Sequence, residues 1–369
     1  MFSDMVFPKE RIMLLNQFSM AFVLAVSSTS YASPQFYGFS REAVGGRSLL
    51  SANDISAGGF VAMSGSNGAV WHPELGFVHE FIPDDAIAVS DNGNIVATQG
   101  GSGARIWTAD NGFQDFSNAN NFIGGISGDG VQVVGSNTGS DQAFIWDESS
   151  GYRLLGGIQG AGGDSTARAI SSDGQTIVGS SWNGTATTAV TISTSGEFTD
   201  LGILNGYSRA EAQGVSSDGR YVVGVARNGL HFGAFRWDRE SEELQNLGGA
   251  LLGLAGFNAF DVSDTGVVVG QSYDESTGVR TAMIYDDDNG WRTVAGMLAA
   301  EFDIVVDPRW QLENVYSISH DGSMIAGSGL FMNASGGLET SAWVAVIPSP
   351  GSFSALAICV LTCMRRCRD

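Results

Sequence analysis

Two aspartates stand at equivalent places in a segment that recurs along the chain. Asp54 and Asp261 each precede an apolar residue and a serine, in Ile55-Ser56 and Val262-Ser263. Two carboxyl groups that share one cleft can act as acid and base on a glycosidic bond. Asp54 and Asp261 are therefore the candidate catalytic pair, and hydration of turns and of a channel is the alternative explanation. We find no other catalytic constellation in the sequence.

An acidic run, Asp286-Asp287-Asp288-Asn289-Gly290, is a candidate for metal binding. Asp286 and Asp288 offer the carboxylate oxygens that calcium prefers. The run lacks the glutamate that closes an EF-hand loop, so a solvated hairpin turn is the alternative. Calcium is the only cofactor that the sequence leaves open, because no metal-ligand spacing relates the four histidines His72, His79, His231 and His320.

The candidate pair belongs to a repeated unit of three parts. An alternating apolar segment ends in Ser, a turn ends in Gly, and a second segment is rich in β-branched residues. Seven copies occur, with their serines at Ser56, Ser90, Ser127, Ser171, Ser216, Ser263 and Ser319. A period of about 45 residues is typical of a four-stranded sheet with its turns. The sequence therefore predicts an all-β fold, a seven-bladed β-propeller of four-stranded antiparallel blades.

The turn within each repeat has a mechanical explanation. An Asp side chain closes the turn, and the Gly that follows it adopts a positive φ. Because the pair recurs in successive repeats, whereas an active site is made once, a structural hairpin is the favoured interpretation. The clearest copies are Asp129-Gly130, Asp173-Gly174, Asp218-Gly219 and Asp321-Gly322.

The last repeat lacks a fourth strand of its own, because Pro348 and Pro350 end its β-structure. The run Phe36-Tyr37-Gly38-Phe39 fits the pattern of that strand. Pairing of this N-terminal strand with the last blade would close the ring and remove an exposed edge. Residues 296–313 depart from the repeat, and residues 297–302 have helical character. This insertion is either a binding element or a cap over the closure.

Both ends of the chain resemble targeting signals. Lys9 and Arg11 precede an apolar run at residues 12–26 and small residues near Ala32, as in a secretory signal peptide. We expect a signal peptide over residues 1–32, the propeller over residues 33–347 and a sorting tail over residues 348–369. The tail combines Pro348, Ser349, Pro350 and Gly351 with an apolar run and then Arg365, Arg366 and Arg368. The terminal arginines would stay cytoplasmic while the apolar run enters the membrane.

The balance of charge excludes several classes of partner. The net charge is −21, and residues 33–347 contain 13 Arg and no Lys against 36 acidic residues. Such a surface repels phosphate backbones and anionic lipids, so we expect no nucleic-acid binding. Cations, neutral glycans and basic proteins remain open as partners. All three cysteines lie in the tail, so the body is no disulfide scaffold.

Two resemblances to known families follow from these motifs. Residues 167–180 and 212–225, with their Ile-Ser, Asp-Gly and Val-Val-Gly elements, resemble the HAF repeats of predicted extracellular proteins. The His of that signature is absent, as in Gln142-Ala143-Phe144, so no role of the His is carried over. The tail resembles the PEP-CTERM sorting signal in a Pro-x-Pro-Gly variant, with Ser349 in place of Glu. This implies an exosortase-like sorting enzyme as partner and transient anchoring in the inner membrane through the C-terminal helix.

The sequence as a whole favours an exported protein of the cell surface or extracellular matrix. In this interpretation a non-catalytic propeller binds an extracellular glycan or a protein partner. An exported glycosidase or lyase that uses channel carboxylates is the first alternative. A structural protein of the cell envelope, which would self-associate and bind no ligand, is the second.

Overall fold

The computed structural model describes residues 34–347, apart from residues 67, 82–83, 102, 117–120, 161–162, 230, 250–255 and 275. Within this part the chain forms 28 strands and one helix, so the all-β prediction is confirmed. No helix in the described residues is long and apolar enough to span a membrane. The predicted signal peptide and the sorting tail, with its prolines and arginines, lie outside the described residues.

The strands assemble into five four-stranded antiparallel sheets and one eight-stranded sheet. Four of the four-stranded sheets follow one another along the chain and use consecutive strands. The first contains β2 (Leu49–Ile55), β3 (Val61–Gly65), β4 (Gly68–His72) and β5 (Gly76–Phe81). The second contains β6 (Asp85–Val89), β7 (Ile95–Gly100), β8 (Gly103–Thr108) and β9 (Gly112–Asp115). The third contains β10 (Asn121–Ile126), β11 (Gln132–Asn137), β12 (Gln142–Asp147) and β13 (Gly151–Gly156).

The next strands form the fourth such sheet and the eight-stranded one. The fourth sheet contains β14 (Ser165–Ile170), β15 (Thr176–Trp182), β16 (Thr187–Ser193) and β17 (Phe198–Gly202). Half of the eight-stranded sheet is β18 (Arg209–Val215), β19 (Tyr221–Asn228), β20 (His231–Asp238) and β21 (Glu243–Gly249). The other half is β22 (Gly256–Val262), β23 (Val268–Tyr273), β24 (Arg280–Asp286) and β25 (Gly290–Thr293). One parallel bridge, between Phe232 and Gly256, joins the two antiparallel halves.

The last sheet takes its strands from both ends of the described chain. It contains β26 (Trp310–Ile318), β27 (Met324–Met332), β28 (Leu338–Val346) and, beside β28, β1 (Gln35–Gly38). The predicted pairing of the leading segment is therefore present, with Tyr37 opposite Val344. The Phe36 ring lies 5.9 Å from the Trp310 ring and 6.1 Å from the Trp343 ring, so aromatic packing supports the junction.

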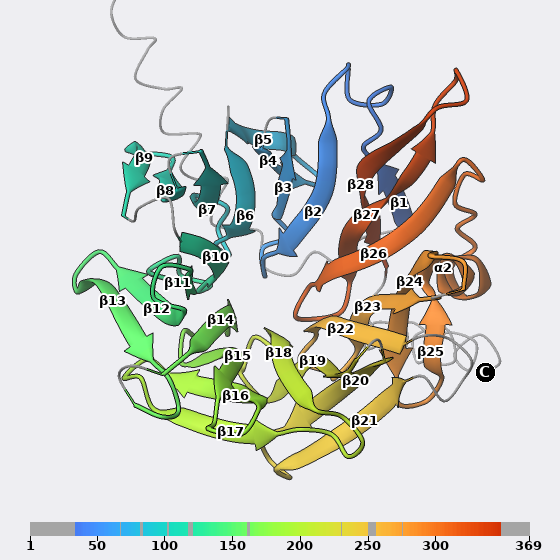
Figure 1. Ribbon diagram of the computed structural model, residues 1–369. Helices are drawn as coiled ribbons and strands as arrows, with labels where there is room; N and C mark the ends of the chain where they lie inside the picture. Colours follow the sequence, from blue (N-terminus) through green and yellow to red (C-terminus); the bar gives the residue numbers. More distant parts are fainter. Residues whose placement is uncertain are drawn as a thin grey trace, which may run out of the picture.

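The sheets stand around a common central opening, and β2, β6, β10, β14, β18, β22 and β26 lie nearest to it (Figure 1). Hydrophobic side chains fill the space between neighbouring sheets. One such cluster joins Ala62 and Val70 of one sheet to Val89 and Val96 of the next. Face-to-face packing of this kind holds neighbouring sheets together.

The helix α2 (Val294–Phe302) is the one described helix and follows β25 directly. Thr293 caps its N-terminus, because the Thr293 hydroxyl accepts a hydrogen bond from the Gly296 amide at 3.1 Å. Its buried residues Met297 and Leu298 pack in a cluster that also contains Trp343 of β28. The helical character predicted for residues 297–302 is thus confirmed, whereas residues 310–313 of the predicted insertion belong to β26. The helix packs on the sheet that closes the ring.

The Asp-Gly turns of four repeats share one hydrogen-bond pattern. In the clearest case Asp173 accepts the Ser171 hydroxyl at 2.5 Å and the Gln175 amide at 2.9 Å. The Ser171 hydroxyl in turn accepts the Thr176 amide at 3.0 Å. Gly174 has a φ of 70°, the left-handed region that glycine tolerates best. Equivalent bonds occur at Asp129, Asp218 and Asp321.

We expect Asp173→Ala to lower the free energy of unfolding by about 1 kcal/mol, because two donors in the turn lose their acceptor. Urea unfolding of the purified protein measures this change. Glu148→Ala, in an exposed hairpin, is the matched control and should change stability by less than about 0.5 kcal/mol. Equal effects of the two substitutions would contradict the role assigned to the turn.

Candidate functional site

The innermost strands each contain a β-bulge two residues before their last residue. In β2, for example, the pairing with β3 shifts register between Ala52 and Asp54. A bulge leaves one residue unpaired and re-aims the side chains around it. The residues passed over by these shifts all line the central cavity: Asn53, Ile87, Gly124, Arg168, Gln213, Phe260 and Tyr316.

The residue after each bulge forms a second ring around the same cavity, which has a volume of about 400 Å³. Four of these residues are alanine or glycine, and three are polar. The polar three come from β2, β22 and β26, which are neighbours because β26 is followed by β2 around the opening (Figure 1). In chain order the ring is Asp54, Ala88, Gly125, Ala169, Gly214, Asp261 and Ser317.

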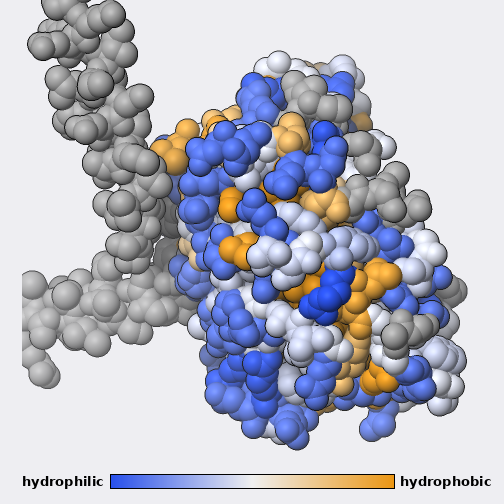
Figure 2. All heavy atoms as spheres, turned by 90° about the vertical axis from the view of Figure 1, so that its left-hand side faces the viewer, coloured by the Kyte–Doolittle hydropathy of each residue, from blue (hydrophilic) through white to orange (hydrophobic). Residues whose placement is uncertain are grey.

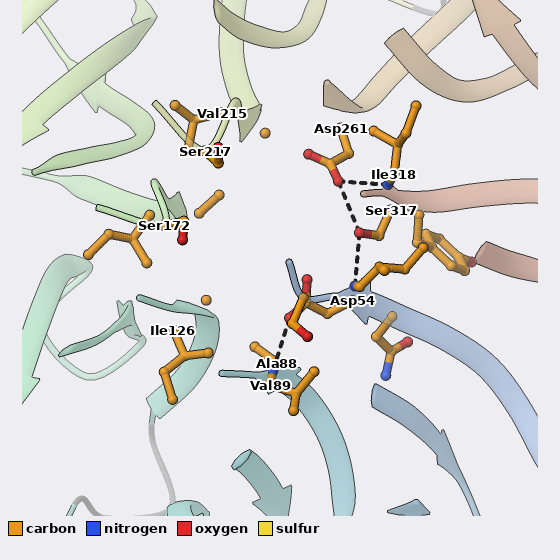
Figure 3. A pocket seen from close by; sticks show the side chains of 18 of the residues that line it. Asp54, Ala88, Val89, Ile126, Ser172, Val215, Ser217, Asp261, Ser317 and Ile318 are labelled. Carbon is orange, nitrogen blue, oxygen red and sulfur yellow. Dashed lines mark hydrogen bonds between the residues drawn. The ribbon is translucent and has the colours of Figure 1, made fainter. Parts of the chain in front are cut away.

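The two candidate aspartates therefore enter one cavity, on either side of Ser317 (Figure 3). Asp261 accepts the Ser317 hydroxyl at 3.0 Å and the Ile318 amide at 2.9 Å. The Ser317 oxygen accepts the Ile55 amide at 3.1 Å. We call Asp261, Ser317 and Asp54 the acidic arc.

Asp54 continues the arc to the next sheet, since it accepts the Val89 amide at 2.9 Å. Each member of the arc thus holds a backbone amide at the end of the neighbouring innermost strand. The hydroxyl of Ser317 is enough for this contact. A carboxylate at the other two positions therefore adds charge that the contact between sheets does not require.

Burial changes the acidity of both carboxyl groups. Desolvation raises the pKa of Asp54 to about 6, although the Val89 and Ile55 amides oppose the shift. Desolvation also raises the pKa of Asp261 to about 7, against the Ile318 and Val262 amides. The nearby charge of Asp54 contributes to the second shift. Near neutral pH the arc can therefore hold or release a proton.

The two ends of the cavity differ in chemistry. At one end Asp91 accepts the Ser172 hydroxyl at 3.1 Å, and Asp264 accepts the Ser217 hydroxyl at 2.6 Å. The second bond connects turns of neighbouring sheets, whereas the first reaches past the β10–β13 sheet. At the other end Arg168 of β14 is exposed. It is the one Arg or Lys among the described residues that line the cavity, and β14 lies across the opening from β26 (Figure 1).

No family model matches the chain, and no curated protein is similar to it in sequence. Several solved structures share its fold at low identity. An oligogalacturonate lyase in complex with manganese matches 86% of this chain and 97% of its own, with 13% identity and a TM-score of 0.52. The β-propeller domain of the Trilobed protease from Pyrococcus furiosus matches 80% of this chain and 95% of its own, with 11% identity and a TM-score of 0.52. The chain has a β-propeller fold.

A third structure agrees with this assignment. Oligogalacturonate lyase from Vibrio parahaemolyticus matches 86% of this chain and 97% of its own, with 10% identity and a TM-score of 0.50. The Pyrococcus propeller has an open velcro topology. The present chain differs from it at the closure, because the N-terminal strand β1 pairs with β28.

The calcium candidates lie in the hairpin between β24 and β25, two strands away from Asp261 across the same sheet. Asp286 accepts the Asn289 amide at 2.8 Å and forms an ion pair with Arg292. Asp287 pairs with Arg236 of β20 at 2.9 Å. Within the described residues no group of three or more His, Cys, Asp or Glu side chains is placed to hold a metal ion. The structure thus gives Asp286 protein partners and does not bring it together with Asp288 in a metal cluster.

Sequence reasoning found the two acids of the propeller channel and missed Ser317 and Arg168. Ser317 occupies the position of Asp54 and Asp261 in the last repeat, so an alignment of the seven repeats would have found it. Arg168 occupies a bulge position, and bulges leave no mark in the pattern of residue types.

Proposed function

We propose that this protein is an exported propeller that binds a ligand in its central channel and does not transform it. The observation that carries the proposal is the acidic arc. Four of the seven equivalent positions are alanine or glycine, so the fold does not require carboxylates there. Two raised-pKa carboxyls in one 400 Å³ cavity are typical of a binding site rather than of packing.

The chemistry of the channel supports a neutral or basic ligand. Asp54, Asp91 and Asp261 line the cavity, whereas Arg168 is the one basic Arg or Lys among its described lining residues. A neutral glycan, or the basic side chain of a protein partner, meets hydroxyls and carboxyls that can accept its hydrogen bonds. Nucleic acids would be repelled.

In this proposal the ring has seven blades. The two halves of the eight-stranded sheet then count as separate blades, because a single bridge between Phe232 and Gly256 joins them. The seven Ser-containing turns of the sequence support the same number. Closure by β1 would complete the last blade.

The cellular location of the protein is also part of the proposal. Residues 1–32 would direct export, and the tail at residues 348–369 would be recognised by an exosortase-like enzyme after transient insertion in the inner membrane. The support is the order of features in the sequence, namely the Pro-x-Pro-Gly motif, the apolar run and the terminal arginines. The mature propeller would then act at the cell surface or in the extracellular matrix, as HAF-repeat proteins are expected to do.

The test is binding of residues 33–347 to polysaccharides from the producing organism, with and without calcium. We expect binding that the double variant Asp54→Asn/Asp261→Asn weakens at least about tenfold, because it loses two charge-assisted hydrogen bonds. Asp129→Asn, in a turn outside the channel, is the control. Binding that is unaffected by the double variant would exclude the channel as the site. Self-association without any ligand would favour the structural role.

An exported glycosidase or lyase is the second candidate, and the raised pKa values of Asp54 and Asp261 favour it. One carboxyl that is protonated beside one that is ionised provides an acid and a base. Two of the similar folds above belong to oligogalacturonate lyases. Release of new reducing ends or unsaturated products by the wild type, but not by the double variant, would establish this candidate over the first.

A further inference from the structure

The channel continues into two further cavities that lie between neighbouring sheets. The channel and a second cavity of about 370 Å³ share Gly124, Arg168 and Gln213. The second cavity and a third of about 250 Å³ have Ser136 and Thr166 in common. The three cavities therefore adjoin one another in a row, which runs outward from the channel between the β10–β13 and β14–β17 sheets. We call the outer part, beyond Arg168, the radial groove.

Two exposed aromatic side chains line the radial groove. Phe122 of β10 is 60% exposed and lines the second cavity. Trp182 of β15 is 44% exposed and lines the third. Most other aromatic side chains of the described chain are buried or half-buried, and Phe113 and Tyr152 are the other exposed ones. Flat apolar faces held open to solvent in a groove can stack on the apolar face of a sugar ring.

The floor of the radial groove consists of small hydroxyl side chains that the neighbouring strands hold in place. The Thr166 and Ser180 hydroxyls lie 2.9 Å apart, and the Ser136 hydroxyl accepts the Ala167 amide at 3.2 Å. Each hydroxyl can both donate and accept, as the hydroxyls of a sugar do. Such a floor recognises polar, uncharged groups.

The charges along the groove exclude a polyanion. Asp141 and Asp164 are exposed at the third cavity, and no Arg or Lys of the described chain lines that cavity. Arg168 lies where the radial groove meets the channel. A polyanionic chain would therefore meet carboxylates at both ends of its path and one guanidinium between them.

The surface also disfavours an apolar partner. On the side of the ring seen in Figure 2, hydrophobic side chains form separate patches between hydrophilic ones. An interface with a membrane or with an apolar protein surface needs one contiguous hydrophobic patch that is larger than these separate ones. A narrow path of alternating aromatic and hydroxyl side chains instead fits an extended chain.

We infer that the radial groove binds a linear uncharged glycan, whose end enters the channel beside the acidic arc. In this arrangement Trp182 and Phe122 stack on successive parts of the chain, and the hydroxyl floor orients it. Arg168 donates hydrogen bonds to the sugar that turns into the channel. The inference rests on the proposed function of the channel and names the ligand class of that site.

The test measures binding of cellohexaose, laminarihexaose, maltohexaose and chitohexaose to the purified protein by calorimetry, with hexagalacturonate as the anionic comparison. We expect at least one neutral hexasaccharide to bind more tightly than hexagalacturonate. Trp182→Ala should weaken its binding about tenfold, with a smaller loss for Phe122→Ala, because stacking faces are removed. Trp182→Phe should restore most of the affinity.

Leu338→Ala removes an exposed apolar side chain of β28 that lines none of the three cavities, and it should leave the affinity unchanged. The disaccharide of the same series, which fills the channel alone, should bind Trp182→Ala and the wild type equally. Loss of hexasaccharide binding in Asp54→Asn/Asp261→Asn but not in Trp182→Ala would overturn the radial groove and leave the channel function intact. Absence of binding by all four neutral hexasaccharides would overturn the glycan assignment of both.

Discussion

Gly38→Val should lower the free energy of unfolding by about 3 kcal/mol, because it forces a side chain into a filled junction. A Cβ atom at Gly38 would lie 2.5 Å from Cζ2 of Trp310 and 2.9 Å from its Cε2. The Trp310 ring cannot easily move aside, since the Phe36 and Phe331 rings pack against it at 5.9 Å and 5.1 Å. The β1 strand must therefore leave β28, and the ring opens.

The measurement is urea unfolding, combined with light scattering at increasing protein concentration. An opened ring exposes the edge of β28, which can pair with the same edge of another molecule. Gln35→Val is the matched control, because Gln35 is exposed in the same strand opposite Val346. If Gly38→Val and Gln35→Val were equally stable and monomeric, closure by β1 would not stabilise the ring.

Asp54→Asn/Asp261→Asn should be more stable than the wild type above pH 7 by several kcal/mol, since one pKa unit corresponds to about 1.4 kcal/mol and the pKa values of both carboxyls are raised. In the folded state the pKa values are about 6 and about 7, raised from 3.8 mainly by desolvation. Between pH 4 and 7 the unfolded chain thus binds fewer protons than the folded one, and wild-type stability falls as the pH rises. The contribution of the two carboxyls is complete below pH 4 and is lost through pH 6 and 7. An asparagine oxygen can still accept the Val89 and Ile318 amides.

The stability difference between variant and wild type, measured from pH 4 to 8, checks this expectation. It should grow with pH and be smallest near pH 4. Asp238→Asn is the control with the opposite sign, because its hydrogen bond with Arg220 lowers the pKa of Asp238. That substitution should cost stability at pH 7 and less on acidification. A difference for the double variant that is independent of pH would show that both acids ionise freely in the channel.

The strands near the axis were predictable because their pattern combines local rules. An alternating segment that ends in Ser, followed by Asp and Gly, specifies a strand and a tight turn without reference to distant residues. β14 accordingly ends at Ile170 and β18 at Val215, directly before their serines. The helix after β25 was predictable for the same reason, since the residues from Met297 to Phe302 form a local helical signal.

The binding surface was harder to predict, because it depends on contacts between repeats. Ser317 lies between Asp261 and Asp54 only because the last sheet stands next to the first. The radial groove depends on which strands face each other across a junction, so Phe122 and Trp182 are unremarkable in sequence. Bulges place Arg168 at the cavity, and their presence depends on pairing rather than on residue type.

The sheet that closes the ring also imposes an order of events on folding. Gln35 pairs with Val346, so a residue near the start of the described chain pairs with one near its end. Such a distant contact is slow to form, because loop-closure entropy opposes it until the intervening chain has collapsed. A ribosome must therefore complete nearly the whole polypeptide before the ring can lock. Until then β1 has no partner strand.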